Sequence, residues 1–280
     1  MNLHCAPCYD AVGYYNFHVR TIRILLILAL FKICASASIF ILAICKDGVV
    51  AVADSRFAFA DVTRPNGQPL AYADGINKII RFDSALMVET GQGFIANQRF
   101  DEFVRQFSAA PIRALEVDEI LPALIEYGAQ TLPSVGVEML RRQHLAVAKF
   151  SEGDAVICGY DGKLRPCIDA GYVQSSPTDF DKLLNRLPKM SGIDVANAAR
   201  ASMQRYIASN GKQVTMGGEF SAALLTPYGI RDLWVLKNPI QARTVDELNT
   251  LVQARKIPVT LVPPATWAEF QELLDSGPAQ

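Results

Sequence analysis

The stretch SIFILAICKDGVVAVAD, residues 38–54, contains two apolar runs separated by Asp47 and Gly48. An Asp-Gly pair between short apolar runs is a strong signal for a tight hairpin turn. Both runs are apolar at nearly every position, so both faces of the sheet that they form should be covered. The stretch therefore predicts an antiparallel hairpin at the centre of the fold.

The segment before this hairpin has the order of a secretory signal. Two arginines precede an apolar run at 24–31, and an Ala-Ser-Ala stretch ends at Ala37. This order predicts cleavage after Ala37, so that the mature chain begins with the free α-amine of Ser38. A hydroxyl and its own base then belong to one residue, which suffices for amide hydrolysis without histidine.

Two other interpretations of the leader stay open. In the first, residues 24–45 form a transmembrane anchor, for which they are long and apolar enough. In the second, residues 1–37 are the propeptide of a cytoplasmic protein. Lys32 interrupts the apolar run, and the β-branched and aromatic residues at 39–42 favour a strand over a membrane helix. The sequence thus predicts a secreted or periplasmic protein if the signal is cleaved and a cytoplasmic one otherwise. A membrane is a partner only if residues 24–45 remain as an anchor.

Composition narrows the function classes. The chain has 280 residues, of which 50% are hydrophobic, and a net charge of −1, which suits one domain with a small extension. Near-neutral charge without a Lys/Arg block gives no electrostatic case for nucleic-acid binding. Of the three histidines only His144 follows the predicted cleavage site. A single histidine gives little basis for a Ser-His-Asp triad or a histidine metal site. We expect no metal and no cofactor, and catalysis must use another base.

Two cysteines flank a predicted turn. Cys158 and Cys167 lie on either side of Asp161 and Gly162, where a hairpin would bring them face to face. A disulfide is compatible with an oxidising compartment, but the sequence favours two buried thiols.

Periodicity predicts strands and helices in alternating groups. Strands are expected at 77–82, 85–89, 145–150, 155–160, 164–168, 219–226 and 231–236, and helices at 100–107, 118–132 and 194–210. The Pro- and Gly-containing stretch 57–73 predicts a loop, and the tail contains a helical stretch at 245–255. Antiparallel hairpins with grouped helices predict an α+β fold, a four-layer αββα sandwich of two antiparallel sheets. The expected organisation is a leader at 1–37, a domain at 38–238 and a C-terminal extension at 239–280.

Three segments carry a family resemblance, with weaker similarities at 157–162 and 216–218. They read KDGVVAVADSR at 46–56, NKIIRFD at 77–83 and TGQG at 90–93. Together they resemble proteasome β-type subunits of the N-terminal nucleophile hydrolase superfamily, from residue 38 to about residue 236. The resemblance implies the αββα fold of that superfamily, proteolysis of peptides or unfolded proteins, and assembly into a homo-oligomeric ring.

The resemblance also assigns catalytic roles. Ser38 occupies the position of the nucleophile, which in this family is usually a threonine released by autocleavage after glycine. Lys78 matches the catalytic lysine, whose ammonium favours a neutral α-amine that accepts the hydroxyl proton. Asp54 matches the acid that pairs with this lysine. Gly91 matches the glycine whose backbone N–H stabilises the oxyanion, where the absence of Cβ permits close approach of a substrate.

One departure from the family affects the α-amine. Active members carry an aspartate and a serine shortly before a late Gly-Gly pair, whereas this chain has Gln213 and Met216. Thr215 or Ser221 are the available substitutes. Two alternatives to a protease therefore stay open: a non-catalytic subunit of the same fold with an assembly role, and a secreted amidase or acylase acting on small molecules.

Overall fold

The computed structural model describes residues 38–63, 69–91, 93–108, 114–210 and 215–262. The predicted leader at 1–37 and Gln213 lie outside these residues. The described part is a mixed α+β structure built from antiparallel sheets, which confirms the predicted α+β class at this level.

The predicted central hairpin is confirmed. Strands β1 (Phe40–Cys45) and β2 (Gly48–Asp54) pair from Phe40↔Ala53 to Cys45↔Gly48, so the loop consists of Lys46 and Asp47. The chain needs glycine at the start of β2 because a Cβ on Gly48 would lie 2.0 Å from the carbonyl oxygen of Leu225, and its φ is +138°. The hairpin is the middle of a five-stranded sheet. The order of this sheet is β11 (Tyr172–Gln174), β1, β2, β12 (Phe220–Thr226) and β13 (Gly229–Trp234).

A second antiparallel sheet faces the first. Its order is β10 (Asp154–Asp161), β9 (His144–Ser151), β6 (Ala85–Thr90) and β5 (Ile79–Arg81). One buried cluster joins the two sheets, with Leu42 and Ala51 from the first and Leu86 and Ala146 from the second. Burial on both faces explains why these strands are apolar at successive positions.

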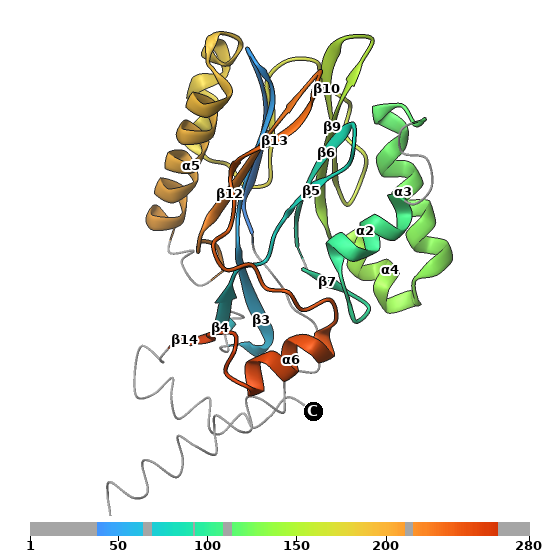
Figure 1. Cartoon of the computed structure of the whole chain (residues 1–280), viewed down its shortest axis with the longest axis vertical. Helices are drawn as coiled ribbons and strands as arrows, with labels where there is room; N and C mark the ends of the chain where they lie inside the picture. Colours follow the sequence, from blue (N-terminus) through green and yellow to red (C-terminus); the bar gives the residue numbers. More distant parts are fainter. Residues whose placement is uncertain (1–37, 64–68, 92, 109–113, 211–214, 263–280) are drawn as a thin grey trace, which may run out of the picture.

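Helices cover the outer face of each sheet (Figure 1). Helix α5 (Gly192–Ser209) packs on the five-stranded sheet with a 3₁₀ helix at Asp179–Lys189. The four-stranded sheet is covered by α2 (Phe100–Ser108), α3 (Val117–Thr131) and α4 (Ser134–Arg141). Helix α4, strand β11 and the 3₁₀ helix were not predicted from the sequence. No helix in the described ranges has the length and apolar character needed to span a membrane.

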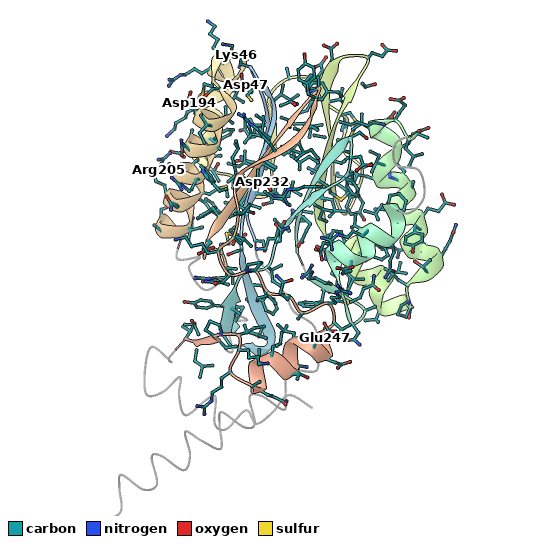
Figure 2. The ribbon with its side chains drawn as sticks, in the orientation of Figure 1. Lys46, Asp47, Asp194, Arg205, Asp232 and Glu247 are labelled. Atoms are coloured by element: carbon teal, nitrogen blue, oxygen red, sulfur yellow. A yellow bond between two sulfur atoms is a disulfide. The ribbon has the colours of Figure 1, made fainter. Side chains whose placement is uncertain are left out.

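The hairpin loop also fixes the start of α5. Figure 2 shows Lys46, Asp47 and Asp194 at the same end of the molecule. The carboxylate of Asp47 accepts a hydrogen bond of 2.7 Å from the backbone N–H of Gly192, and Ser191 caps the helix by accepting from the N–H of Asp194. Both oxygens satisfy N–H groups that have no partner within the helix. The helix therefore begins at Gly192, before the predicted start at residue 194, and its N-cap is Ser191.

The prediction of a loop at 57–73 is wrong. Strands β3 (Arg56–Thr63) and β4 (Pro69–Asp74) form a hairpin, and β14 (Thr260–Leu261) adds a third strand. Phe57 and Ala73 are fully buried against α6 (Val245–Gln253), a helix that the tail was expected to contain. Small and aromatic side chains alternate in 57–73, and this alternation was a missed signal for strands. The buried face of the hairpin is covered by residues more than 170 positions later in the sequence.

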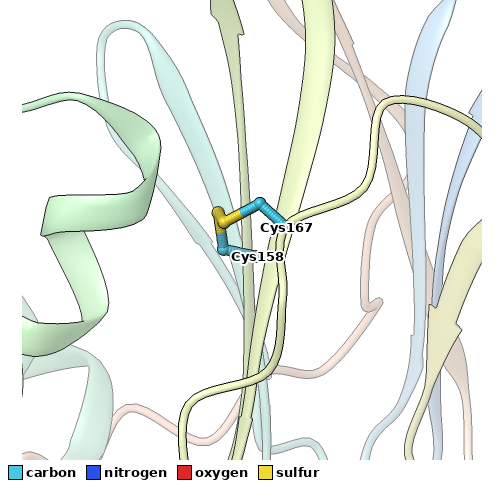
Figure 3. Close-up of a disulfide and its surroundings, with 2 residues drawn as sticks. All are labelled: Cys158 and Cys167. Carbon is cyan, nitrogen blue, oxygen red and sulfur yellow. A yellow bond between two sulfur atoms is a disulfide. The ribbon is translucent and has the colours of Figure 1, made fainter.

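The predicted pair of free thiols is also wrong, because Cys158 and Cys167 form a disulfide (Figure 3). The predicted strand at 164–168 is reduced to isolated bridges, one of which pairs Ile157 with Ile168. That bridge places the next residue of β10 opposite Cys167, with the two Cα atoms 4.2 Å apart.

Loss of this disulfide should reduce stability by a measurable amount. Replacing Cys158 with alanine and Cys167 with serine opens a loop with a sequence separation of 9 residues, and the chain-entropy model gives a loss of about 2–3 kcal/mol. Urea unfolding with and without reductant measures it. Reductant should destabilise the wild-type protein and leave the double variant unchanged. Equal sensitivity of the two proteins would contradict the bridge.

Candidate active site

The strand ends bring the candidate residues to one end of the two sheets, where β3 and β4 extend from the sandwich (Figure 1). Ser38 lies two residues before β1, and Asp54 is the last residue of β2. Lys78 directly precedes β5, and Gly91 directly follows β6. Because neighbouring strands are antiparallel, the start of one lies beside the end of the next.

The Lys78 ammonium is the centre of the site. It donates hydrogen bonds to Ser38 Oγ at 2.6 Å, to Asp54 Oδ1 at 2.7 Å and to the Arg56 carbonyl oxygen at 2.6 Å. These three acceptors match the three N–H groups of an ammonium. The side chain of Lys78 is 1% exposed, so its charge interacts with these partners in a medium that water screens little.

Asp54 is held by donors on both oxygens. Besides Lys78, the Ile39 N–H donates to Oδ1 at 3.1 Å and the Gly217 N–H donates to Oδ2 at 2.8 Å. Complete burial raises the pKa of the Asp54 carboxyl, and the Lys78 charge with the two N–H donors counteracts that rise. Asp54 is fully buried, so its pair with Lys78 is not a surface salt bridge.

Three of the four predicted residues therefore form one contact cluster: Ser38, Asp54 and Lys78. An ammonium beside a hydroxyl lowers the cost of forming an alkoxide there, and the paired carboxylate keeps the ammonium fixed. Such a cluster suits a serine nucleophile that works without histidine.

Gly91 occupies a conformation that favours glycine, with φ at +136°. A Cβ on Gly91 would lie 2.1 Å from Oε1 of Gln143, a fully buried side chain. The close approach that the sequence predicted at this glycine is thus made, in this structure, by Gln143. The predicted oxyanion role of the Gly91 N–H stays a prediction.

Substituting Gly91 with alanine should disturb both the backbone and Gln143. We expect a loss of about 2–4 kcal/mol of unfolding free energy, because a strained φ is combined with a steric clash. Gly153→Ala is the matched control, since Gly153 also has positive φ, at +96°, and nothing lies within 4 Å of its Cβ position. The control should lose about 1 kcal/mol. Urea unfolding of the two variants checks the difference, and equal losses would contradict it.

Further residues position the cluster and were not found from the sequence. Ser175 Oγ accepts from the Phe40 N–H at 3.0 Å and donates to the Ser38 carbonyl oxygen at 3.4 Å, which fixes the backbone beside the hydroxyl. The guanidinium of Arg56 binds both carboxylate oxygens of Asp74 at 2.8 and 3.0 Å, which anchors the strand whose carbonyl contacts Lys78. A serine after a strand and an arginine at a strand end carry no distinctive sequence signal, so only the structure identifies them.

Of the two predicted departures, Gln213 and Met216, the structure describes Met216 and both of its possible substitutes. Met216 is 5% exposed and packs in the core between the five-stranded sheet and α5, with no polar group to offer an α-amine. Ser221 is 2% exposed and pairs with Ala53, next to Asp54, while Thr215 precedes Met216 at partial exposure.

No protein-family model matches this chain, and no curated protein matches it with significance.

Among the described residues, no group of three His, Cys, Asp or Glu side chains is arranged to hold a metal ion.

Proposed function

We propose that residues 38–238 are an N-terminal nucleophile hydrolase domain, similar to proteasome β subunits, which cleaves peptide or related amide bonds through Ser38. The observation that carries the proposal is the buried contact of the Lys78 ammonium with Ser38 Oγ and Asp54, at 2.6 and 2.7 Å. The order of layers, helix, sheet, sheet, helix, supports the αββα fold of that superfamily (Figure 1).

The proposed reaction begins with removal of residues 1–37, which frees the α-amine of Ser38. The amine accepts the proton of Oγ while Oγ attacks the substrate carbonyl carbon, and the Gly91 N–H faces the oxyanion. The C–N bond then breaks as the leaving amine takes up the proton. An acyl ester on Oγ remains, and water activated by the same α-amine hydrolyses it. The Lys78 ammonium, fixed by Asp54, favours the neutral form of the amine.

The compartment and assembly follow as parts of the same proposal. Signal cleavage after Ala37 would expose the nucleophile and release the protein into an oxidising compartment, and the Cys158–Cys167 disulfide is suited to such a compartment. The proteasome resemblance supports a homo-oligomeric ring that restricts access to unfolded chains.

Met216 favours a second candidate, a non-catalytic subunit of this fold. Its buried thioether occupies the position of a serine that helps to orient the α-amine in active family members. A chain with an unoriented amine would keep the fold and the buried ion pair without hydrolysing substrates.

A substrate panel tests the proposed function. Purified protein is incubated with unstructured fluorogenic peptides and with small acyl amides, and the release of amine is measured for each. Faster cleavage of the peptides supports a protease, whereas exclusive cleavage of small acyl amides supports the amidase alternative. Absence of cleavage in a preparation whose N-terminus is Ser38 would contradict the proposal and favour the non-catalytic subunit.

A further inference from the structure

Glu89 is a buried carboxyl group for which the proposed reaction has no role. It lies in β6, a strand in which every residue is buried, and it is 2% exposed. Its Oε2 atom has no hydrogen-bond partner. An acidic side chain in such a place costs stability unless it is neutral or compensated, so its presence calls for a physical reason.

The strand register places Glu89 beside the catalytic lysine. Its N–H donates to the Lys78 carbonyl oxygen at 3.1 Å, continuing the pairing of Ile79 with Val88. The Lys78 ammonium already has three acceptors, namely Ser38 Oγ, Asp54 Oδ1 and the Arg56 carbonyl. A carboxylate at Glu89 would therefore compete for an ammonium whose donors are all in use.

The charges around Glu89 favour its neutral form. Burial raises the pKa of Glu89 to about 8, the Lys78 charge opposes that rise, and Asp101 and Asp54 add to it. Asp101, from α2, is itself bound by Arg99 and Arg105, while the next strand, β9, places Leu145 opposite Glu89 and the exposed His144 opposite Thr90. With Glu89 neutral, the cluster contains one ammonium and one carboxylate, which balance.

We propose that Glu89 is a positioning residue that controls the Lys78–Ser38 contact through its own protonation. As a neutral acid it leaves the ammonium with Ser38 and Asp54. When it loses its proton to solvent, the new carboxylate draws the ammonium away from Ser38 Oγ and opposes negative charge on the oxyanion. Hydrolysis is thereby switched off at alkaline pH. This inference rests on the proposed function for its effect on hydrolysis, but the coupling itself is measurable without any activity.

The first test measures stability. Because the folded state keeps the proton of Glu89 and the unfolded state releases it near pH 4.5, stability from this group is present at low pH and is lost as pH rises through about 8. Between pH 6 and pH 9 the unfolding constant of the wild type should therefore rise by about a hundredfold relative to that of Glu89→Gln. Glu89→Met, also neutral, should behave in the same way if the glutamine variant folds poorly. Glu152→Gln, at an exposed turn, is the control and should follow the wild type.

The second test is the pH profile of kcat/KM on the best peptide substrate. The wild type and Glu152→Gln should lose about tenfold between pH 7 and pH 9, as expected for one ionisation near pH 8. The profiles of Glu89→Gln and Glu89→Met, each normalised to its own value at pH 7, should stay level. An alkaline loss of the same size in the neutral variants would overturn the inference, as would an unfolding constant with the same pH dependence in all four proteins.

The two tests separate this inference from the proposed function. If unfolding shows the predicted coupling but hydrolysis does not depend on Ser38, the proposed function fails and with it the catalytic effect of Glu89. If hydrolysis depends on Ser38 but the profiles coincide, the proposed function stands and Glu89 has no role in it.

Discussion

Replacing Ser38 with alanine is expected to reduce kcat/KM by about 10⁴-fold or more. The reason is that no other group in the catalytic cluster can replace the nucleophile. The fold should persist. The change removes one of three acceptors of the Lys78 ammonium, which corresponds to about 1–3 kcal/mol of unfolding free energy. Hydrolysis of a fluorogenic peptide and urea unfolding of the same preparation measure the two effects together.

Ser38→Thr is the matched control for this substitution. Threonine keeps the hydroxyl and the α-amine, and it is the usual nucleophile of the family that the chain resembles. We expect this variant to keep most of the activity. Hydrolysis by Ser38→Ala at the level of Ser38→Thr would contradict the assigned nucleophile.

Replacing Lys78 with methionine should affect both activity and stability. Methionine fills the space of the lysine stem, but it leaves Asp54 as an uncompensated charge with no exposed surface. Breaking a buried pair in this way typically costs about 3–5 kcal/mol. Hydrolysis should fall by about 10²–10⁴-fold, since the ammonium no longer supports proton transfer from Ser38.

A double variant distinguishes the structural role of this pair from its catalytic role. Adding Asp54→Asn to Lys78→Met removes the uncompensated charge, so that about half of the lost stability should return while hydrolysis stays low. Lys182→Met, which removes an exposed partner from a contact of 3.8 Å, is the surface control and should change stability by less than about 1 kcal/mol. Recovery of hydrolysis in the double variant would contradict the assigned role of Lys78.

Local patterns predicted much of the fold. The Asp47-Gly48 signal, the alternation of apolar helical positions and the grouping of strands and helices identify the central hairpin, α2, α3, α5 and the α+β class. These features depend on neighbours in the sequence. The β3–β4 hairpin was missed because its buried face is covered by α6, which lies far away in the sequence. The disulfide was missed because two facing cysteines fit either a pair of buried thiols or a bond, and the sequence does not decide between them.

Some residues of the candidate site were predicted from the sequence, and others were identified only by the structure. Ser38, Asp54 and Lys78 were predicted from their place in the proposed family pattern, and the structure brings them into contact. Ser175 and the N–H of Gly217 contribute ordinary backbone-anchoring bonds, which leave no signature in a single sequence. Glu89 did leave a signal, because it is the one charged residue in the apolar strand ALMVET.

In the proposed reaction the catalytic base is the α-amine of Ser38, and this amine exists only after the preceding residues are released. The most direct measurement is the N-terminal sequence and intact mass of the hydrolytically active protein. We predict that the active chain begins at Ser38 and that a variant in which cleavage after Ala37 is blocked folds without hydrolysing peptides. Full activity in a chain that still carries Ala37 would show that a group other than this α-amine is the base.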